Sequence, residues 1–229
     1  MGILNLLFPR KCLGCGKEGA YFCAGCLNLV SELNEDICPV CERPSIGGWT
    51  HHSCQKTLNL DGLTSVFAYK GLVKKAIVQL KYRFVFDLAS DLVELFLSFS
   101  GERDGFRQVC RKNDLCLVPV PLHPRRKRWR GFNQSELLGK IIAKNLGIGF
   151  APDILIRVKN TTPQMQLGEK ERRVNIQGAF RLSPNILVSQ YPNVLLFDDV
   201  WTTGATLKET AKILKQGGVT TVWGLTLAR

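Results

Sequence analysis

The chain has 229 residues, of which 45% are hydrophobic and 22% are charged, and its formal net charge is +12 at pH 7. A chain of this length and composition can bury a sizeable core, which argues against intrinsic disorder and suggests an ordinary domain with a smaller one beside it. No apolar run approaches the roughly 18 residues of a membrane span, and the start of the chain lacks a secretory signal, so we expect a cytoplasmic protein.

The positive charge is unevenly distributed along the chain. Residues 1–60 contain five Lys and Arg against five Asp and Glu, so the whole excess lies in residues 61–229. Such an excess favours an anionic partner, either a phosphorylated small molecule or nucleic acid, although solubility alone is the simpler alternative.

Eight potential metal ligands lie near the N-terminus, in the patterns C-x2-C-x7-C-x2-C and C-x2-C-x9-H-x2-C. Thiolates and imidazole in this ratio suit two structural Zn²⁺ ions, and a short segment with little core needs metal to fold. We therefore predict a double zinc-binding module over residues 1–60. Sequential sites are favoured over a cross-braced pair, His52 is an alternative to His51, and a disulfide framework is the less favoured reading. The predicted ligands are Cys12, Cys15, Cys23, Cys26, Cys38, Cys41, His51 and Cys54.

From residue 61 onward, hydrophobic patterns of strand and helix alternate, while residues 148–190 look irregular. Alternation of this kind predicts an α/β fold with a mainly parallel sheet flanked by helices, in which sites lie at the carboxyl ends of the strands. The expected strands cover residues 63–70, 115–121, 193–199 and 219–228, and the expected helices cover 72–82, 86–99, 133–147 and 205–218.

Two acids end the third expected strand, and a small-residue loop follows it, in the stretch VLLFDDVWTTGAT. Asp198 and Asp199 end the apolar run, and Thr202, Thr203, Gly204, Ala205 and Thr206 lead into a helix. Free backbone N–H groups and the positive end of the helix dipole favour a phosphate in such a loop. Because no lysine follows the glycine as in a Walker A motif, a nucleoside triphosphatase is disfavoured.

A basic stretch follows the second expected strand. It contains Arg125, Arg126, Lys127, Arg128 and Arg130, with Trp129 among them. Cations interleaved with an aromatic suit single-stranded nucleic acid, where each stacked base contributes about 1 to 3 kcal/mol. A solvated basic loop with Trp129 packed inward is the alternative.

The stretch VLLFDDVWTTGAT resembles the phosphoribosyl pyrophosphate motif of the type I phosphoribosyltransferases. The resemblance implies that Asp198 and Asp199 bind the ribose hydroxyls, that residues 202–206 bind the 5-phosphate, and that Mg²⁺ accompanies phosphoribosyl pyrophosphate. It also implies that a loop in the position of residues 125–130 can bind pyrophosphate.

The cysteine-rich start, PVPLHPRRKRWRGFNQSELL and DDVWTTGAT together resemble the competence protein ComF family almost end to end. Residues 157–180 also resemble that family, at the position of a mobile catalytic loop, which makes Gln164, Arg172, Arg173 and Asn175 candidates. The two arginines are candidates for clamping pyrophosphate, with a charged surface helix as the alternative. His51 stands where the family more often has cysteine, and imidazole is an equally good zinc ligand.

The family resemblance implies a role in handling single-stranded DNA during uptake in natural transformation, with proteins of the DNA-uptake machinery as partners. A catalytically active phosphoribosyltransferase in nucleobase salvage or nucleotide metabolism is the alternative. The sequence supports a ligand site more strongly than it supports turnover.

Overall fold

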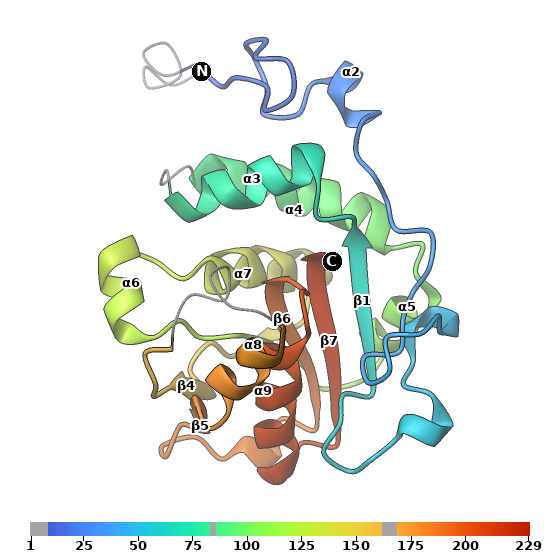
Figure 1. Cartoon of the computed structure of the whole chain (residues 1–229), viewed down its shortest axis with the longest axis vertical. Helices are drawn as coiled ribbons and strands as arrows, with labels where there is room; N and C mark the ends of the chain where they lie inside the picture. Colours follow the sequence, from blue (N-terminus) through green and yellow to red (C-terminus); the bar gives the residue numbers. More distant parts are fainter. Residues whose placement is uncertain (1–8, 83–85, 162–168) are drawn as a thin grey trace.

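The computed structural model describes residues 9–82, 86–161 and 169–229. Its centre is one five-stranded sheet in the order β1-β7-β6-β2-β3, and every pairing within it is parallel (Figure 1). The predicted α/β fold with a mainly parallel sheet is therefore confirmed. The strands are β1 (Gly62–Phe67), β2 (Leu115–Pro119), β3 (Gly149–Phe150), β6 (Asn193–Val200) and β7 (Thr221–Ala228).

Helices cover both faces of this sheet, and the central strands supply hydrophobic residues to both. Along β6, Leu195 and Phe197 pack into one core while Val194 and Leu196 pack into the other, as the alternation of side chains along a strand requires. The first core contains residues of α3 (Gly71–Tyr82), α4 (Phe86–Ser100), α5 (Asp104–Cys110) and α7 (Gln134–Leu146). The second contains residues of α9 (Ala205–Gln216), α8 (Glu169–Ile176), β4 (Leu155–Arg157) and β5 (Phe180–Leu182).

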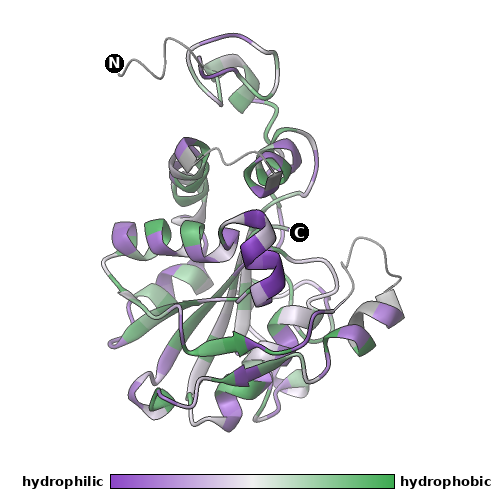
Figure 2. Ribbon diagram, turned by 90° about the vertical axis from the view of Figure 1, so that its left-hand side faces the viewer, coloured by the Kyte–Doolittle hydropathy of each residue, from purple (hydrophilic) through white to green (hydrophobic). Residues whose placement is uncertain are grey.

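Four elements differ from the sequence prediction. Strands β4 and β5 form a separate antiparallel hairpin inside the region that looked irregular, and they are too short, at three residues each, to show a strand pattern. Helix α5 was also not predicted. The basic stretch is not a loop but helix α6 (Pro124–Arg130), which Figure 2 shows as a strongly hydrophilic helix.

Local signals explain why α6 is helical. The ring nitrogen of His123 accepts a hydrogen bond from the backbone N–H of Arg125, and Pro124 occupies the first helical position. Gly131 ends the helix with a φ of 81°, which glycine adopts without strain. The run of arginines between these signals is compatible with a helix because arginine is a good helix former.

The cysteine-rich N-terminal region contacts the sheet domain in two places. The first cysteine segment (residues 10–30) lies over α3 and α4, where Arg10 forms an ion pair with Asp87 at 3.3 Å (Figure 1). The second cysteine segment (residues 36–55) lies against β1, β7 and α5, where the rings of Trp49 and Trp223 meet edge to face at 4.7 Å. The boundary at residue 60 stays a prediction.

In the described part of the chain, no helix is both long and apolar enough to cross a bilayer.

Candidate functional site

The eight predicted metal ligands form two separate groups. Within each group the ligand atoms all lie within 4.8 Å of one another. The sequential arrangement is therefore confirmed over the cross-braced one, and His51 is the histidine of the second group. The groups are Cys12, Cys15, Cys23 and Cys26 in the first cysteine segment, and Cys38, Cys41, His51 and Cys54 in the second.

The geometry of His51 suits a metal ligand. Its Nδ1 lies 3.3 Å from Cys41 Sγ, and its Nε2 lies 3.0 Å from the carbonyl oxygen of Pro44. If Nε2–H donates to that carbonyl, the tautomer leaves the lone pair of Nδ1 directed at the thiolates, which is the usual orientation of a zinc-bound imidazole. The neighbouring His52 is not part of the group, so the geometry favours His51 over the alternative ligand.

In each group, hydrogen bonding favours the thiolate form that zinc requires at one cysteine, whereas hydrogen bonds raise the pKa of Cys26 in the first group, and burial with hydrogen bonds raises the pKa of Cys54 in the second. The backbone N–H of Cys23 lowers the pKa of Cys12 to about 6, in opposition to its burial. The backbone N–H and side chain of Arg43 lower the pKa of Cys41 to about 6 in the second group. Four sulfurs in one group, and three sulfurs with one imidazole in the other, are ligand sets of structural Zn²⁺.

The acidic pair lies within β6 at its carboxyl end, as predicted. Lys81 Nζ, at the end of α3, forms an ion pair with Asp199 Oδ2 at 2.6 Å. Asp198 Oδ1 accepts hydrogen bonds from Ser135 Oγ at 3.0 Å and from the backbone N–H of Asp199 at 2.9 Å. Both carboxylates are thus held in fixed orientations by residues from three different elements.

The two carboxylates have different electrostatic environments. Loss of hydration raises the pKa of Asp198 to about 7, the charge of Asp199 acts in the same direction, and Lys81 and Ser135 oppose it. Burial is the largest single influence and acts to lower the pKa of Lys81, but the charge of Asp199, its hydrogen bond to Lys81 and the charge of Asp198 together shift the pKa upward. Lys81 therefore carries a full positive charge beside the pair near neutral pH.

The small-residue loop (residues 202–206) connects this pair to α9, as predicted. Asp198 and Trp201 lie with Gly204 and Thr206 around a shallow hollow of about 10 Å³. Gly204 has a φ of 66°, and a Cβ on it would lie 2.2 Å from the ring of Trp201. Glycine is therefore required here for two reasons, its left-handed backbone and the close approach of an aromatic ring.

A second cationic residue, Arg157, lies near the acidic pair. It belongs to β4, is 9% exposed, and donates from Nη2 to Thr161 Oγ1 at 2.5 Å. Arg126 of α6 donates to the carbonyl oxygen of the same threonine. Burial and the charge of Arg126 lower the pKa of Arg157 to about 10, while Asp198 acts in the opposite direction.

No carboxylate among the described residues neutralises Arg157 directly. Among the described residues no carboxylate forms an ion pair with it, and its buried Nε has no hydrogen-bond partner. A buried guanidinium without a counter-ion is costly, so this position favours the binding of an anion.

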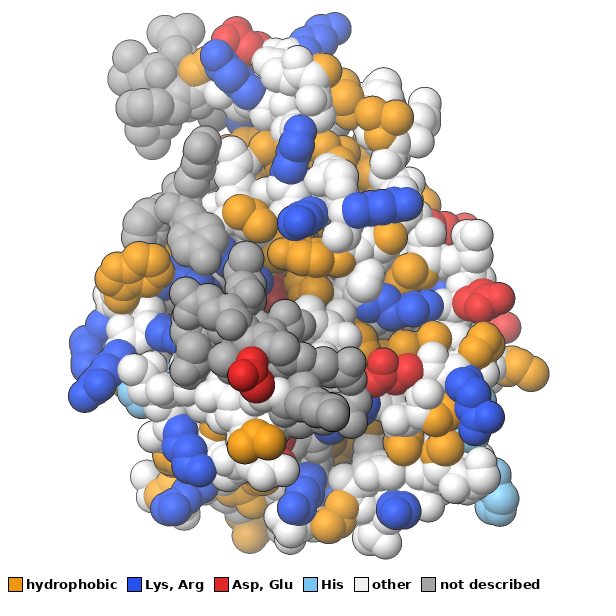
Figure 3. Space-filling view, in the orientation of Figure 1, with side chains coloured by type: hydrophobic (Ala, Val, Ile, Leu, Met, Phe, Trp, Pro, Cys, Tyr) orange, Lys and Arg blue, Asp and Glu red, His pale blue; other side chains and the backbone are white. Residues whose placement is uncertain are grey.

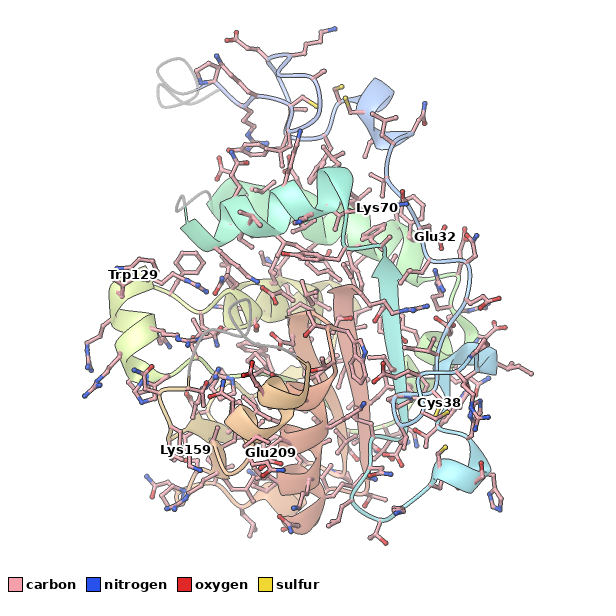
Figure 4. All side chains as sticks on the ribbon, in the orientation of Figure 1. Glu32, Cys38, Lys70, Trp129, Lys159 and Glu209 are labelled. Carbon is pink, nitrogen blue, oxygen red and sulfur yellow. The ribbon has the colours of Figure 1, made fainter. Side chains whose placement is uncertain are left out.

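The basic helix α6 exposes most of its charge. Arg125, Lys127 and Arg128 are exposed, and blue side chains gather at this edge in Figure 3. Trp129 is 73% exposed and lies on α6 in Figure 4, so the inward-packed alternative is wrong. Arg130 donates to Gln134 Oε1 at 2.7 Å and Arg126 contacts Thr161, so these two also serve the fold.

The remaining candidates lie in or beside a region that is not described. Gln164 falls outside the described residues. Arg172 and Arg173 lie on the backbone of α8, but their side chains are outside the description, whereas Asn175 is partly buried on the same helix. Their proposed roles stay predictions.

Lys81, Ser135 and Arg157 were not identified from sequence. Ser135 lies inside the family-like stretch NQSELL, which was a usable signal, but its contact with Asp198 joins residues 63 positions apart. Lys81 and Arg157 carry no local pattern that separates them from other basic residues.

Known proteins resemble the chain in both parts. A family model described as a double zinc ribbon domain matches residues 3–58. Competence protein F of Haemophilus influenzae is 40% identical over 134 residues, which make up 58% of each chain. DNA utilization protein YhgH of Salmonella typhimurium is 32% identical over 208 residues, 87% of this chain and 86% of that protein. Competence protein ComFC of Bacillus subtilis is 29% identical over 222 residues, 93% of this chain and 86% of that protein.

Two long matches and one shorter match thus agree with each other and with the family resemblance of the motifs. The chain belongs to the ComF family of competence and DNA utilization proteins.

Proposed function

We propose that the chain binds phosphoribosyl pyrophosphate with Mg²⁺ at the carboxyl end of β6, and that it acts on single-stranded DNA during DNA uptake in natural transformation. The observation that carries the ligand proposal is the hollow shared by Asp198 and the loop of residues 202–206. The names of the relatives, which refer to competence and DNA utilization, support the biological part.

The parts of the ligand have matching groups on the protein. The N-terminal end of α9, with its positive dipole and the hydroxyls of the loop before it, suits the 5-phosphate, and Asp198 and Asp199 suit the ribose hydroxyls one sugar away. Arg157 suits the diphosphate, because it is a buried cation that no described carboxylate neutralises. We infer that the ligand spans the space between these groups.

In this proposal, Mg²⁺ binds to the protein together with phosphoribosyl pyrophosphate. Among the described residues, groups of three or more metal-ligating side chains occur at the two cysteine centres and not around Asp198. Mg²⁺ in proteins is commonly held by one or two carboxylates together with substrate phosphates and water, so the site needs no protein cage.

The ligand proposal is tested by calorimetric titration with phosphoribosyl pyrophosphate and Mg²⁺. We expect Asp198→Asn with Asp199→Asn to weaken binding by roughly 10- to 100-fold, since hydrogen bonds to charged groups contribute about 1.5 to 3 kcal/mol. Asp153→Asn, at an exposed position and not among the residues that line the hollow, is the matched control. Equal affinity in all three proteins would remove the sugar-binding role.

Catalysis is a second candidate function, favoured by the position of Arg157. A cation beside the expected diphosphate could stabilise the leaving group when the bond at the anomeric carbon breaks, and carboxylates could stabilise the developing positive sugar. A panel of nucleobases with phosphoribosyl pyrophosphate and Mg²⁺ tests for pyrophosphate release. Release in wild type and its loss in Arg157→Met would support turnover, whereas silence across the panel would support a binding role.

A further inference from the structure

Lys208, in the first turn of α9, connects the second cysteine segment to the small-residue loop of residues 202–206, which is called the phosphate loop from here on. Its Nζ lies 2.9 Å from Glu42 Oε1 and 3.4 Å from the carbonyl oxygen of Thr203. The same ammonium lies over the ring of Trp201, 5.1 Å from its centroid. One side chain therefore contacts both the metal-binding segment and two residues at the start of the loop.

The position of Glu42 depends on the second metal centre. Glu42 follows the ligand Cys41 and has a φ of 60°, a left-handed conformation that is uncommon for a residue with a side chain. The backbone N–H of Glu42 donates to the carbonyl oxygen of Cys38 at 2.9 Å. The backbone N–H of Cys38 donates to the carbonyl oxygen of Arg43, also at 2.9 Å. A metal ion bound by Cys38 and Cys41 would close this turn and hold the Glu42 side chain toward α9. Cys38 is labelled in Figure 4.

The backbone conformation of the loop depends on the position of the Trp201 ring. Because a Cβ on Gly204 would lie 2.2 Å from the ring, the ring and the Gly204 backbone cannot move independently. Gly204 is the N-cap of α9 and directly precedes the N–H groups expected to bind phosphate. A cation that holds Trp201 and Thr203 thus sets the direction of those N–H groups.

Lys208 spans a gap between the two elements. A hollow of about 100 Å³ lies between the second cysteine segment and α9, lined by Pro39, Val40, Asn59, Leu60 and Lys208. Across such a hollow there is little packing to transmit a displacement, so the charged contact has a larger share in the coupling than it would in a packed interface.

We propose that Lys208 is a positioning residue through which the second metal centre holds the phosphate loop in its ligand-binding conformation. Metal bound by Cys38, Cys41, His51 and Cys54 then favours ligand binding at the loop. By linkage, the ligand favours retention of that metal by the same factor. The identity of the ligand rests on the proposed function, but the coupling between the segment and the loop does not.

The first test uses amide hydrogen exchange without any ligand. In Glu42→Gln and in Lys208→Met, we expect faster exchange over residues 201–207 than in wild type, because the loop loses its clamp. The matched control is Glu18→Gln in the first cysteine segment, where Glu18 also pairs with a lysine, Lys11, at 3.5 Å. Exchange in Glu42→Gln that equals exchange in wild type would overturn the proposal.

The second test measures affinity for phosphoribosyl pyrophosphate with Mg²⁺ by calorimetry. We expect Glu42→Gln to bind on the order of two- to fivefold more weakly, the range expected for a partly exposed ion pair. Removal of a negative charge near an anion site should by itself strengthen binding, so weaker binding points to positioning. A Glu42→Gln, Lys208→Met double variant should lose less than the sum of the single losses.

The outcomes separate this proposal from the proposed function. If the Asp198 and Asp199 double variant loses binding while Glu42→Gln does not, the ligand site stands and the coupling fails. If wild type does not bind phosphoribosyl pyrophosphate, the ligand proposal fails, and the exchange measurement still decides the coupling. Zinc content equal to that of wild type in Glu42→Gln shows that the variant acts on the loop and not through loss of metal.

Discussion

Two regions of the molecule are suited to binding anions, and they differ in how far their charged side chains are exposed to solvent. At the carboxyl end of β6, Lys81 and Asp199 form an ion pair whose side chains are only 21% and 13% exposed. Between α6 and α7, Lys127 and Glu136 form an ion pair whose side chains are 51% and 36% exposed. The first region is a preorganised pocket edge and the second is a solvated cationic surface. Partly buried charges escape screening by salt, whereas exposed ones do not.

The largest difference is expected in stability. Lys81→Met leaves two neighbouring carboxylates without their cation, so we expect the free energy of unfolding to fall by about 2 to 4 kcal/mol, near the range for breaking a buried pair. Lys127→Met, the matched change on α6, should cost less than about 1 kcal/mol. Urea denaturation of both variants measures the contrast. Similar losses in the two would show that the acidic pair is as well solvated as the surface pair.

The second contrast concerns the exposed aromatic of α6. Trp129→Leu should weaken binding of a single-stranded oligonucleotide by about 1 to 3 kcal/mol if the indole stacks on a base. It should leave phosphoribosyl pyrophosphate binding unchanged, because Trp129 is 73% exposed on a different element from the phosphate loop. Fluorescence anisotropy of labelled DNA measures the first quantity and calorimetry the second. Unchanged DNA affinity would place base stacking elsewhere.

Salt dependence should also separate the two regions. Arg125→Gln with Arg128→Gln removes two exposed cations and spares Arg126 and Arg130, which have internal contacts. If both contact DNA phosphates, the slope of log affinity against log salt should fall by about 0.7 per contact for single strands. The slope for phosphoribosyl pyrophosphate should stay as in wild type. An unaltered DNA slope would assign the nucleic-acid surface to other residues.

The same two regions show which features of the site could be predicted from the sequence and which could not. Short-range motifs could be recognised before the fold was known, because their residues lie close together in the sequence. These motifs are the acidic pair, the loop of residues 202–206 and both sets of metal ligands. The site also includes Lys81, Ser135 and Arg157, which are brought there by contacts between elements far apart in the sequence. The residues next to a basic or hydroxyl side chain in the sequence do not indicate such a contact. For α6, the signals at His123, Pro124 and Gly131 were present, but the arginine run was interpreted as a loop.

The smallest expected effect is a pH dependence at Asp198. Its folded-state pKa is raised to about 7 by loss of hydration and by the charge of Asp199, well above the ordinary aspartate value. The folded protein therefore holds this proton more tightly than the unfolded chain does, and the resulting stabilisation is present at low pH and lost as the pH rises through 7. We expect wild type to lose stability between pH 6 and pH 8 through this group.

Asp198→Asn isolates that contribution, since an amide oxygen can still accept the hydrogen bonds from Ser135 Oγ and from the Asp199 N–H. The difference in unfolding free energy, variant minus wild type, should become more positive from pH 6 to pH 8. Urea melts at the two pH values measure it. A constant difference would mean that Asp198 is charged throughout this range, in which case the pocket edge is more hydrated than its contacts indicate and resembles the solvated surface of α6.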